Sequence, residues 1–153
     1  MLLNFFPAKN GSLNCSYNNK FFHSNYNPEN EAEKFVNALN YNFIPEIIFI
    51  SEPALSYSAS YLRKKFPFTK LIAIRFSNAF IEYDNVWDSV INFKENTIEN
   101  DLDNFITEEN FSSCIFLSWK NSENIFIKEA EVFWNLLKNY LQIKHDILNT
   151  KNY

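Results

Sequence analysis

The chain has 153 residues, of which 46% are hydrophobic and 18% are aromatic, and its formal net charge is −4. This length suits one domain with one core, and the absence of a long basic stretch excludes the usual charge pattern of a nucleic-acid-binding protein. No segment approaches the roughly 18 consecutive apolar residues of a membrane span, so we expect a cytoplasmic protein without one.

Residues 1–26 are predicted to form a small β-hairpin extension. Asn10-Gly11 is a strong turn signal, and Asn18-Asn19 also suits a tight hairpin, because asparagine and glycine tolerate positive φ. Residues 13–17 alternate as in a short strand, and residues 20–23 are expected to supply its partner. Two cysteines, Cys15 and Cys114, are too few for a disulfide framework.

A helix is predicted to begin directly after this extension. Asn27 is suited to the N-cap, Pro28 to the first helical position, and acidic residues follow in the first turn. Apolar residues then recur at helical spacing, which indicates one buried face. They are Ala32, Phe35, Val36 and Leu39.

The middle of the chain is typical of a parallel α/β fold. Residues 47–50 and 71–74 are continuously apolar, as in strands buried on both faces. A helix is expected between them, over residues 57–66 and ending at Pro67. Strand, helix and strand in about thirty residues form a βαβ unit. Residues 27–153 are therefore predicted to be a Rossmann-like, mostly parallel α/β unit, which with the hairpin makes a single domain over 1–153.

The second half gives weaker signals before two clear elements. A short helix or irregular segment is expected near Phe80, a strand near Val90, and an acidic helix over residues 102–106. Residues 114–119 are apolar enough for a further buried strand. A long helix is predicted over residues 122–148, which contain neither proline nor glycine.

Residues 23–32 read H-S-N-Y-N-P-E-N-E-A. This run resembles the H-S-x-Y-D-P-x-x-E-A signature of the 6-hydroxymethylpterin diphosphokinase-like family, which includes motility-associated glycosyltransferases. The similarity extends to the turn at residues 8–12 and to the strand at 116–119. The signature positions are His23, Ser24, Tyr26, Asn27, Pro28 and Glu31.

The resemblance implies a cofactor loop, G-x-G-L-G-Y, after the first buried strand, and an acid at the end of the second. Such glycines allow a tight turn and close approach of backbone to pyrophosphate. The only glycine here, Gly11, lies far upstream. Leu55 and Tyr57 match the fixed positions, whereas Glu52, Ala54 and Ser56 stand where the glycines belong, and Arg75 stands where the acid belongs.

These substitutions disfavour nucleotide binding. Glu52 brings a negative charge to a place where phosphate needs donors, and Pro53 removes one backbone N–H. Arg75 has no acceptor for ribose hydroxyls. Two alternatives remain for this arginine: it pairs with a ligand phosphate, or it pairs with Glu52 across the strand ends, and the second is favoured.

Other reactive side chains give no sharper indication of chemistry. His23 and Ser24 are neighbours on an extended segment, so they point to opposite faces and are badly placed to act as base and nucleophile. We expect His23 to tie the hairpin to the following helix through a hydrogen bond. Cys15 and His23 lack the spacing of a zinc site, and the acidic residues of 95–109 lack the spacing of an EF-hand. We predict no metal and no cofactor.

The predicted C-terminal helix has an unusually wide apolar face. It covers about half the circumference, against the roughly 100° that a surface helix buries. Either this domain buries the whole face, or the excess contacts another chain, most simply in a homodimer. The candidate interface residues are Phe133, Trp134, Leu137, Tyr140 and Leu141.

The sequence thus favours a degenerate, non-catalytic Rossmann-like binding or interaction module related to the N-terminal part of these transferases. The alternative is a transferase, of glycosyltransferase or diphosphokinase type, or a subunit of one. That alternative would bind a nucleotide-like ligand near residues 52–57.

Overall fold

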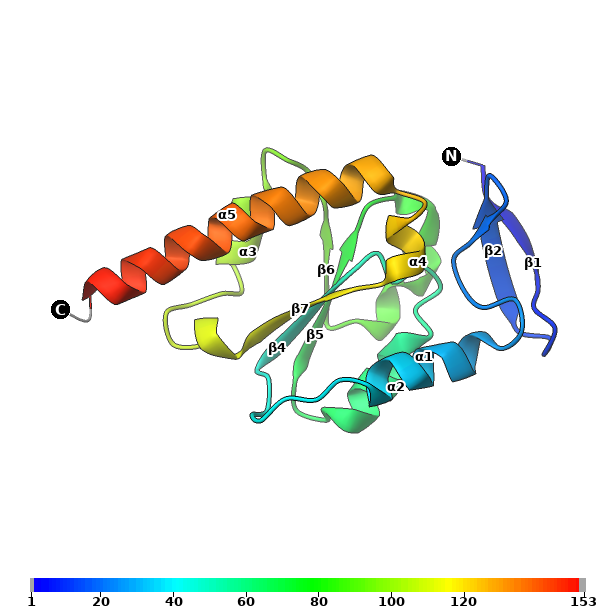
Figure 1. Ribbon diagram of the computed structural model, residues 1–153, viewed down its shortest axis with the longest axis horizontal. Coiled ribbons are helices and arrows are strands. Elements are labelled where there is room, and N and C mark those ends of the chain that lie inside the picture. Colours follow the sequence, from blue (N-terminus) through cyan, green and yellow to red (C-terminus); the bar gives the residue numbers. More distant parts are fainter. Residues whose placement is uncertain (1, 152–153) are drawn as a thin grey trace.

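The computed structural model describes residues 2–151, which form two sheets and the helices around them (Figure 1). The strands are β1 (Asn4–Pro7), β2 (Leu13–Tyr17), β3 (Lys20–Phe21), β4 (Ile47–Ser51), β5 (Lys70–Arg75), β6 (Ser89–Asn92) and β7 (Cys114–Ser118). The α-helices are α1 (Pro28–Asn37), α2 (Ser58–Lys65), α3 (Ile98–Asp103), α4 (Lys120–Glu123) and α5 (Ile127–Lys151). Two 3-10 segments, η1 (Asn78–Val86) and η2 (Phe111–Ser113), complete the list.

The central sheet has four strands in the order β6-β5-β4-β7, and every pairing is parallel. Of these four strands β4 comes first along the chain, yet it lies inside the sheet. β5 and β6 follow on one side of it and β7 lies on the other side, so the direction of strand addition reverses between β4 and β7. This is the order of a Rossmann-like half, in which ligands bind outside the carboxyl ends of the strands at the reversal. The predicted α/β class with a mostly parallel sheet is confirmed.

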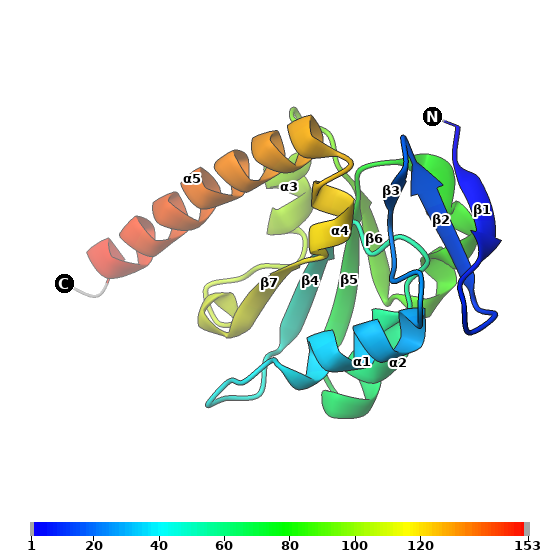
Figure 2. The ribbon, with the colours of Figure 1, turned by 45° about the vertical axis from the view of Figure 1, so that its right-hand side comes forward.

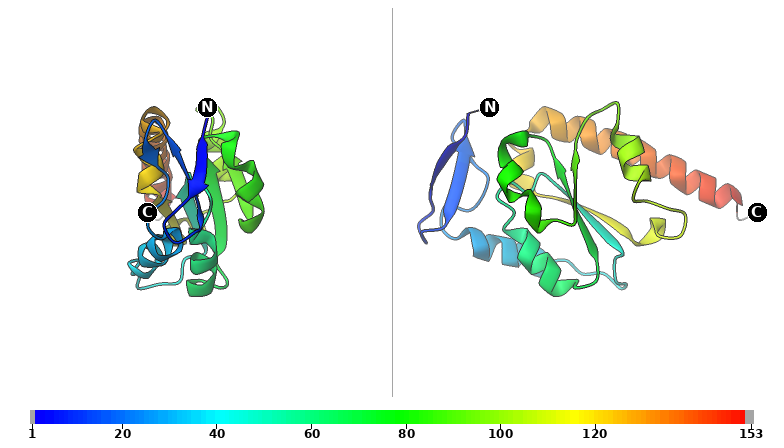
Figure 3. Two further views of the ribbon diagram at one scale, coloured as in Figure 1. Left: turned by 90° about the vertical axis from the view of Figure 1, so that its right-hand side faces the viewer. Right: turned by 180° about the vertical axis from the view of Figure 1, so that it is seen from behind.

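Helices cover both faces of this sheet (Figure 3). Side chains alternate along β4, so each face receives apolar groups that pack against the helices on that side. Ile48 and Ile50 point to one face and pack with the buried sides of α1 and α2. Ile47 and Phe49 point to the other face, where α3 and α5 lie. The apolar runs of the sequence are buried on both sides, as in parallel sheets generally.

The N-terminal strands form a separate antiparallel sheet in the order β1-β2-β3. It lies at the end of the molecule toward which β7 runs (Figure 1). The turn at Asn10-Gly11 is confirmed, with Gly11 at φ 91°. Phe22 and Cys15 are buried in a cluster with Phe80 and Phe126, which attaches the small sheet to the central domain.

The start of α1 follows the sequence prediction. The Asn27 side chain accepts a hydrogen bond from the Asn30 N–H at 2.9 Å, and Pro28 occupies the first helical position. Ala32 and Val36 are fully buried, and Phe35 and Leu39 pack beside them.

Three predicted elements differ from the structure. β3 ends at Phe21 rather than residue 23, because the Asn14 side chain replaces the ladder there: its Oδ1 accepts from the His23 N–H and its Nδ2 donates to the His23 carbonyl. α3 lies earlier than predicted, over Ile98–Asp103, and its buried residues are Ile98 and Leu102.

The predicted long helix is also interrupted. α4 ends at Glu123 and α5 begins at Ile127. The break between them carries Phe126 into the cluster around Phe22, at 5.8 Å between ring centroids. No proline or glycine marks this position, so the cause is tertiary packing rather than local sequence.

Candidate functional site

The loop after β4 has an unusual backbone. Glu52, Ala54 and Ser56 have positive φ angles of 37°, 50° and 66°. Left-handed conformations cost an L-residue roughly 1–2 kcal/mol each and suit glycine. These are the three positions that stand where the G-x-G-L-G-Y pattern has glycines, so the loop has a glycine-type backbone without glycines.

The Glu52 side chain turns into this loop. It is fully buried, and its Oε2 accepts from the Ala54 N–H at 3.1 Å while Oε1 accepts from the Phe76 N–H at 3.0 Å. Burial raises the pKa of this carboxyl above its ordinary value, and the nearby Arg75 guanidinium and the two backbone N–H groups oppose that rise. The chain's own carboxylate therefore takes up backbone donors that a bound anion would need.

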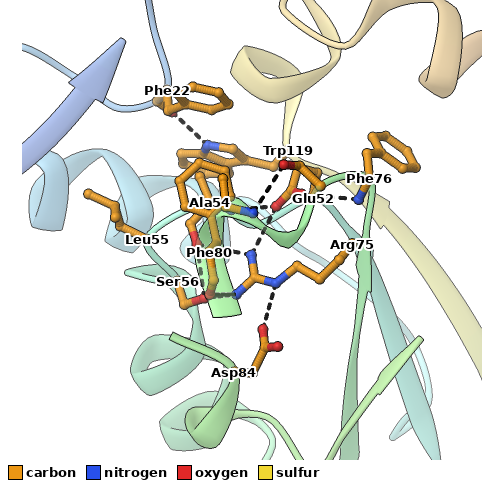
Figure 4. A network of polar contacts seen from close by, with 12 residues as sticks. Phe22, Glu52, Ala54, Leu55, Ser56, Arg75, Phe76, Phe80, Asp84 and Trp119 are labelled. Atoms are coloured by element: carbon orange, nitrogen blue, oxygen red, sulfur yellow. Dashed lines mark hydrogen bonds and ion pairs between the residues drawn. The ribbon is translucent and has the colours of Figure 1, made fainter. Parts of the chain in front are cut away.

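Arg75 ends β5 beside this carboxylate (Figure 4). Its Nη1 donates to Glu52 Oε2 and to the Ala54 carbonyl, both at 2.9 Å, and its Nη2 donates to Ser56 Oγ at 3.1 Å and to the Phe80 carbonyl at 3.5 Å. Its Nε donates to Asp84 Oδ1 at 2.8 Å.

A guanidinium has five N–H donors, and the contacts of Arg75 account for all of them. The pairing with Glu52, favoured from the sequence, is thus present, and no donor is left for a ligand phosphate. The Trp87 Nε1–H also donates to Ser56 Oγ, at 2.9 Å. Asp84 and Trp87 were not expected at this site from the sequence, because neither follows a strand end or belongs to a motif.

His23 holds the hairpin segment against the loop. Its Nε2 accepts from the Leu55 N–H at 3.1 Å, and its ring lies edge-on to Tyr57 with centroids 5.0 Å apart. Burial lowers the pKa of His23 to about 3, so the imidazole is neutral. The expected structural hydrogen bond exists, but it joins the hairpin to the loop after β4 rather than to α1.

Tyr57 ties the same loop to β2. Its hydroxyl donates to the Leu13 carbonyl at 2.5 Å, and burial raises its pKa to about 12. The loop residues from Glu52 to Ser56 are buried, as is Arg75. The candidate cleft near residues 52–57 is therefore closed over by the chain itself.

The other signature residues shape the turn before α1. The Ser24 hydroxyl accepts from the Tyr26 and Asn27 N–H groups, and Glu31 Oε1 accepts from the Ser24 N–H at 2.7 Å. Glu31 Oε2 accepts from Asn121 Nδ2 at 3.0 Å, across 90 positions of the chain. No local signal in the sequence identifies Asn121 as this partner.

An open cleft of about 780 Å³ lies beside this turn. Its walls come from β3 and the signature turn on one side, and from α4 and the start of α5 on the other. Figure 2 shows β3 on the side of the hairpin sheet that faces α4. The lining residues are Lys20, Phe21, His23, Ser24, Asn25, Tyr26, Glu31, Asn121, Asn124 and Ile127.

Most of the predicted interface residues on α5 belong to the core. Phe133, Leu137 and Tyr140 are buried against the sheet and α3, so they are not available to another chain. Trp134 and Leu141 are partly buried. The exposed apolar groups of α5 are Ile127 (59% exposed) at its start, and Ile143 (56% exposed) and Ile147 (45% exposed) further along the helix.

Residues 2–151 contain neither a metal-binding cluster nor a helix that could cross a membrane. No group of three or more His, Cys, Asp or Glu side chains is placed to hold a metal ion in this range. Nor does any helix within it have the length and apolar content to cross a membrane. Both cysteines are free thiols, and burial raises the pKa of Cys15 to about 12 and that of Cys114 to about 11.

Comparison of the chain with protein-family models, with curated proteins and with solved structures found no match. The resemblance to the 6-hydroxymethylpterin diphosphokinase-like family therefore depends only on the residue patterns given above for residues 8–12, 23–32, 52–57 and 116–119.

Proposed function

We propose that this chain is a non-catalytic binding or interaction module, built on a Rossmann-like domain whose cofactor loop has been filled by its own side chains. The observation that carries the proposal is the arrangement of Arg75, whose donors are all used by Glu52, Ala54, Ser56, Phe80 and Asp84. Phosphate recognition requires free donors at the loop, and the carboxylate of Glu52 repels an incoming anion.

The state of the reactive side chains supports the same proposal. A general base needs a pKa near the working pH, whereas burial lowers the pKa of His23 to about 3. A nucleophilic cysteine needs a lowered pKa, whereas burial raises the pKa of Cys15 to about 12. Two free thiols also suit a reducing compartment such as the cytoplasm, which is the location we propose.

Isothermal titration calorimetry tests the proposal. S-adenosylmethionine, UDP-glucose and a pterin are titrated into the full chain, and no binding heat is expected from any of them. Micromolar binding of one of these compounds overturns the proposal. Far-UV circular dichroism of the same sample confirms that the protein titrated is folded.

The transferase alternative has one observation in its favour, namely the left-handed backbone at Glu52, Ala54 and Ser56. A ligand phosphate would then have to displace Glu52 from Arg75. This alternative requires turnover of a nucleotide-activated substrate, and turnover must be lost in Arg75→Ala while the fold persists. Absence of turnover in the parent chain removes it.

The proposal includes a protein partner at α5, most simply a second copy. The exposed residues Ile143 and Ile147 support a contact on the last turns of this helix rather than at Phe133, Leu137 and Tyr140. Light scattering should give twice the 18.2 kDa chain mass, and Ile143→Glu with Ile147→Glu should halve it. A monomer at all concentrations contradicts this part of the proposal.

A further inference from the structure

In the β2–β3 hairpin, the main-chain N–H and C=O of one residue, Phe21, point away from the partner strand. Asn18 and Asn19 have φ angles of 50° and 62°, and they connect the paired residues Tyr17 and Lys20 as a two-residue loop with positive φ at both positions. The residues that flank such a loop exchange hydrogen bonds, and hydrogen-bonded pairs then alternate with non-hydrogen-bonded pairs.

The alternation fixes the direction of the Phe21 main chain. Phe21 is paired with Ser16, one step beyond the loop-flanking pair. The next residue, Phe22, again donates its N–H to the Cys15 carbonyl, at 3.0 Å. Phe21 therefore belongs to a non-hydrogen-bonded pair. Its N–H and C=O point away from β2 and outward from the free edge of the small sheet.

This free edge borders two hollows. The cleft of about 780 Å³ lies between β3 and α4, and a second hollow of about 360 Å³ lies over the face of the small sheet that carries Phe6 and Ser16. Phe21 and Asn25 line both. A strand added beside β3 would direct successive side chains to opposite faces, so each hollow would receive alternate side chains.

The remaining lining groups are those that an uncharged polypeptide would use. The side-chain amides of Asn25 and Asn124 make no hydrogen bond to any residue within 2–151, and each offers donors and an acceptor to a peptide backbone. Phe21 is 45% exposed, and Tyr26 and Ile127 are also exposed.

The charges of the cleft balance. Lys20 Nζ donates to the Asn124 carbonyl at 3.1 Å, and Glu31 is held by Ser24 and Asn121. One cation and one anion, each with a partner inside the chain, favour neither a phosphate nor a strongly charged peptide. An uncharged segment matches this balance.

We propose that the edge of β3 binds an extended, uncharged polypeptide segment of a partner protein by strand addition, with the Phe21 N–H and C=O as the central main-chain contacts. This inference rests on the proposed function as a binding module and adds the chemistry of the partner. It uses neither the filled loop nor the end of α5.

The test begins with a phage-displayed library of random linear peptides. The full chain is immobilised through its C-terminal end, because α5 runs away from the hairpin sheet (Figure 1). Selected peptides are expected to be uncharged, with alternating apolar residues. Amide hydrogen exchange should show a fast Phe21 N–H in the free protein and a protected one in the complex.

Two variants at one position isolate the main-chain contact. Phe21→Pro and Phe21→Ala both remove the ring, but only proline removes the outward N–H, and an edge position with an outward N–H accepts proline. Phe21→Pro should bind the selected peptide about tenfold more weakly than Phe21→Ala. Protection of the Phe22 N–H, which donates to Cys15, checks that each variant keeps the hairpin.

Several results overturn the inference: no enriched peptide, equal binding by the two variants, or peptide binding that leaves the Phe21 amide unprotected. Protection of that amide by self-association alone assigns the edge to a second copy instead. The exchange measurement on the parent chain decides the question even if Phe21→Pro does not fold. None of these results changes the calorimetric test of the filled loop, so the two proposals fail separately.

Discussion

The filled loop after β4 and the open cleft beside β3 lie close together at the carboxyl end of the central sheet. They differ in whether their polar groups have hydrogen-bond partners within the chain. In the loop, the Arg75 donors and the Glu52 acceptors are all satisfied inside the chain. In the cleft, the amides of Asn25 and Asn124 make no hydrogen bond within residues 2–151, and the Phe21 main chain points outward.

The difference indicates that the loop contributes to the stability of the fold, whereas the cleft has polar groups available for binding. A buried and fully satisfied polar network contributes to a unique fold and leaves nothing for a ligand. An exposed set of unsatisfied groups contributes little to folding and is available to a partner. The loop after β4 is therefore not the place where this chain offers contacts.

The largest expected effect concerns the buried ion pair. Arg75→Met leaves the Glu52 charge without its partner and should lower the free energy of unfolding by about 4 kcal/mol. In the double variant with Glu52→Gln, the loss should be smaller than the sum of the single losses by about 2 kcal/mol. Urea unfolding provides all three values.

An exposed pair supplies the control for this cycle. Arg63 and Asp88 are 3.0 Å apart with side chains 40% and 38% exposed. Arg63→Met should cost less than about 1 kcal/mol. Additive losses at Glu52 and Arg75, or a loss no larger than that of Arg63→Met, contradict the description of the loop.

The second effect is a pH dependence from His23. The pKa of His23 is about 3 in the folded chain, below the ordinary value of 6.5. Between pH 6.5 and pH 3, the histidine is therefore protonated in the unfolded chain and neutral in the folded chain. This contribution is fully present above pH 6.5 and is lost as the pH falls toward 3, at about 1.4 kcal/mol per pH unit.

The measurement compares unfolding at several pH values in the parent chain and in His23→Gln. The difference between the two stability curves isolates this histidine, because the carboxylates titrate in both proteins. His145→Gln, at an exposed histidine on α5, is the matched control substitution. Parallel curves for the parent and His23→Gln would show that the imidazole is not held neutral.

The third effect concerns the left-handed backbone of the loop. Ala54 has φ 50°, whereas Ala59 lies inside α2, and both side chains are buried. Ala54→Gly relieves a strained conformation, and Ala59→Gly adds the cost of glycine in a helix. Ala54→Gly should therefore be less destabilising than Ala59→Gly by about 1 kcal/mol in thermal unfolding. Equal losses would indicate that the loop backbone is not strained.

The smallest effect belongs to the cleft. Asn25→Ala and Asn124→Ala should each leave the free energy of unfolding within about 0.5 kcal/mol of the parent value, since neither side-chain amide has a partner within residues 2–151. Asn14→Ala is the matched contrast, because the Asn14 amide holds His23 and Cys15. A loss at Asn124 as large as that at Asn14 would place the cleft among the stabilising parts of the molecule.

Local signals account for the parts of the fold that were predictable. The turn at Gly11, the Asn27 cap and the buried strands each depend on a few neighbouring residues. The pairing of Glu52 with Arg75 was also accessible, because β4 and β5 are adjacent parallel strands with Ser51 opposite Ile74. Residues directly after such a pair lie side by side.

Contacts between distant segments were not accessible in the same way. Asp84 and Trp87 reach the loop only through the path of η1 and the turn that follows it, and Asn121 of α4 reaches Glu31 of α1 across 90 positions of the chain. The break at Phe126 is likewise set by the cluster that receives its ring. The sequence predicted the width of the apolar face on α5. It did not predict that α3 and the sheet bury Phe133 and Leu137.

The central claim is that the chain's own Glu52 occupies the anion position of the loop, and a ¹H–¹⁵N NMR titration tests it most directly. UDP-glucose or S-adenosylmethionine is added to the full chain up to millimolar concentration while the Ala54 and Phe76 amides are followed, since both donate to Glu52. We predict that neither resonance moves. A saturable shift of these two amides would contradict the account, because it would mean that a ligand displaces the carboxylate.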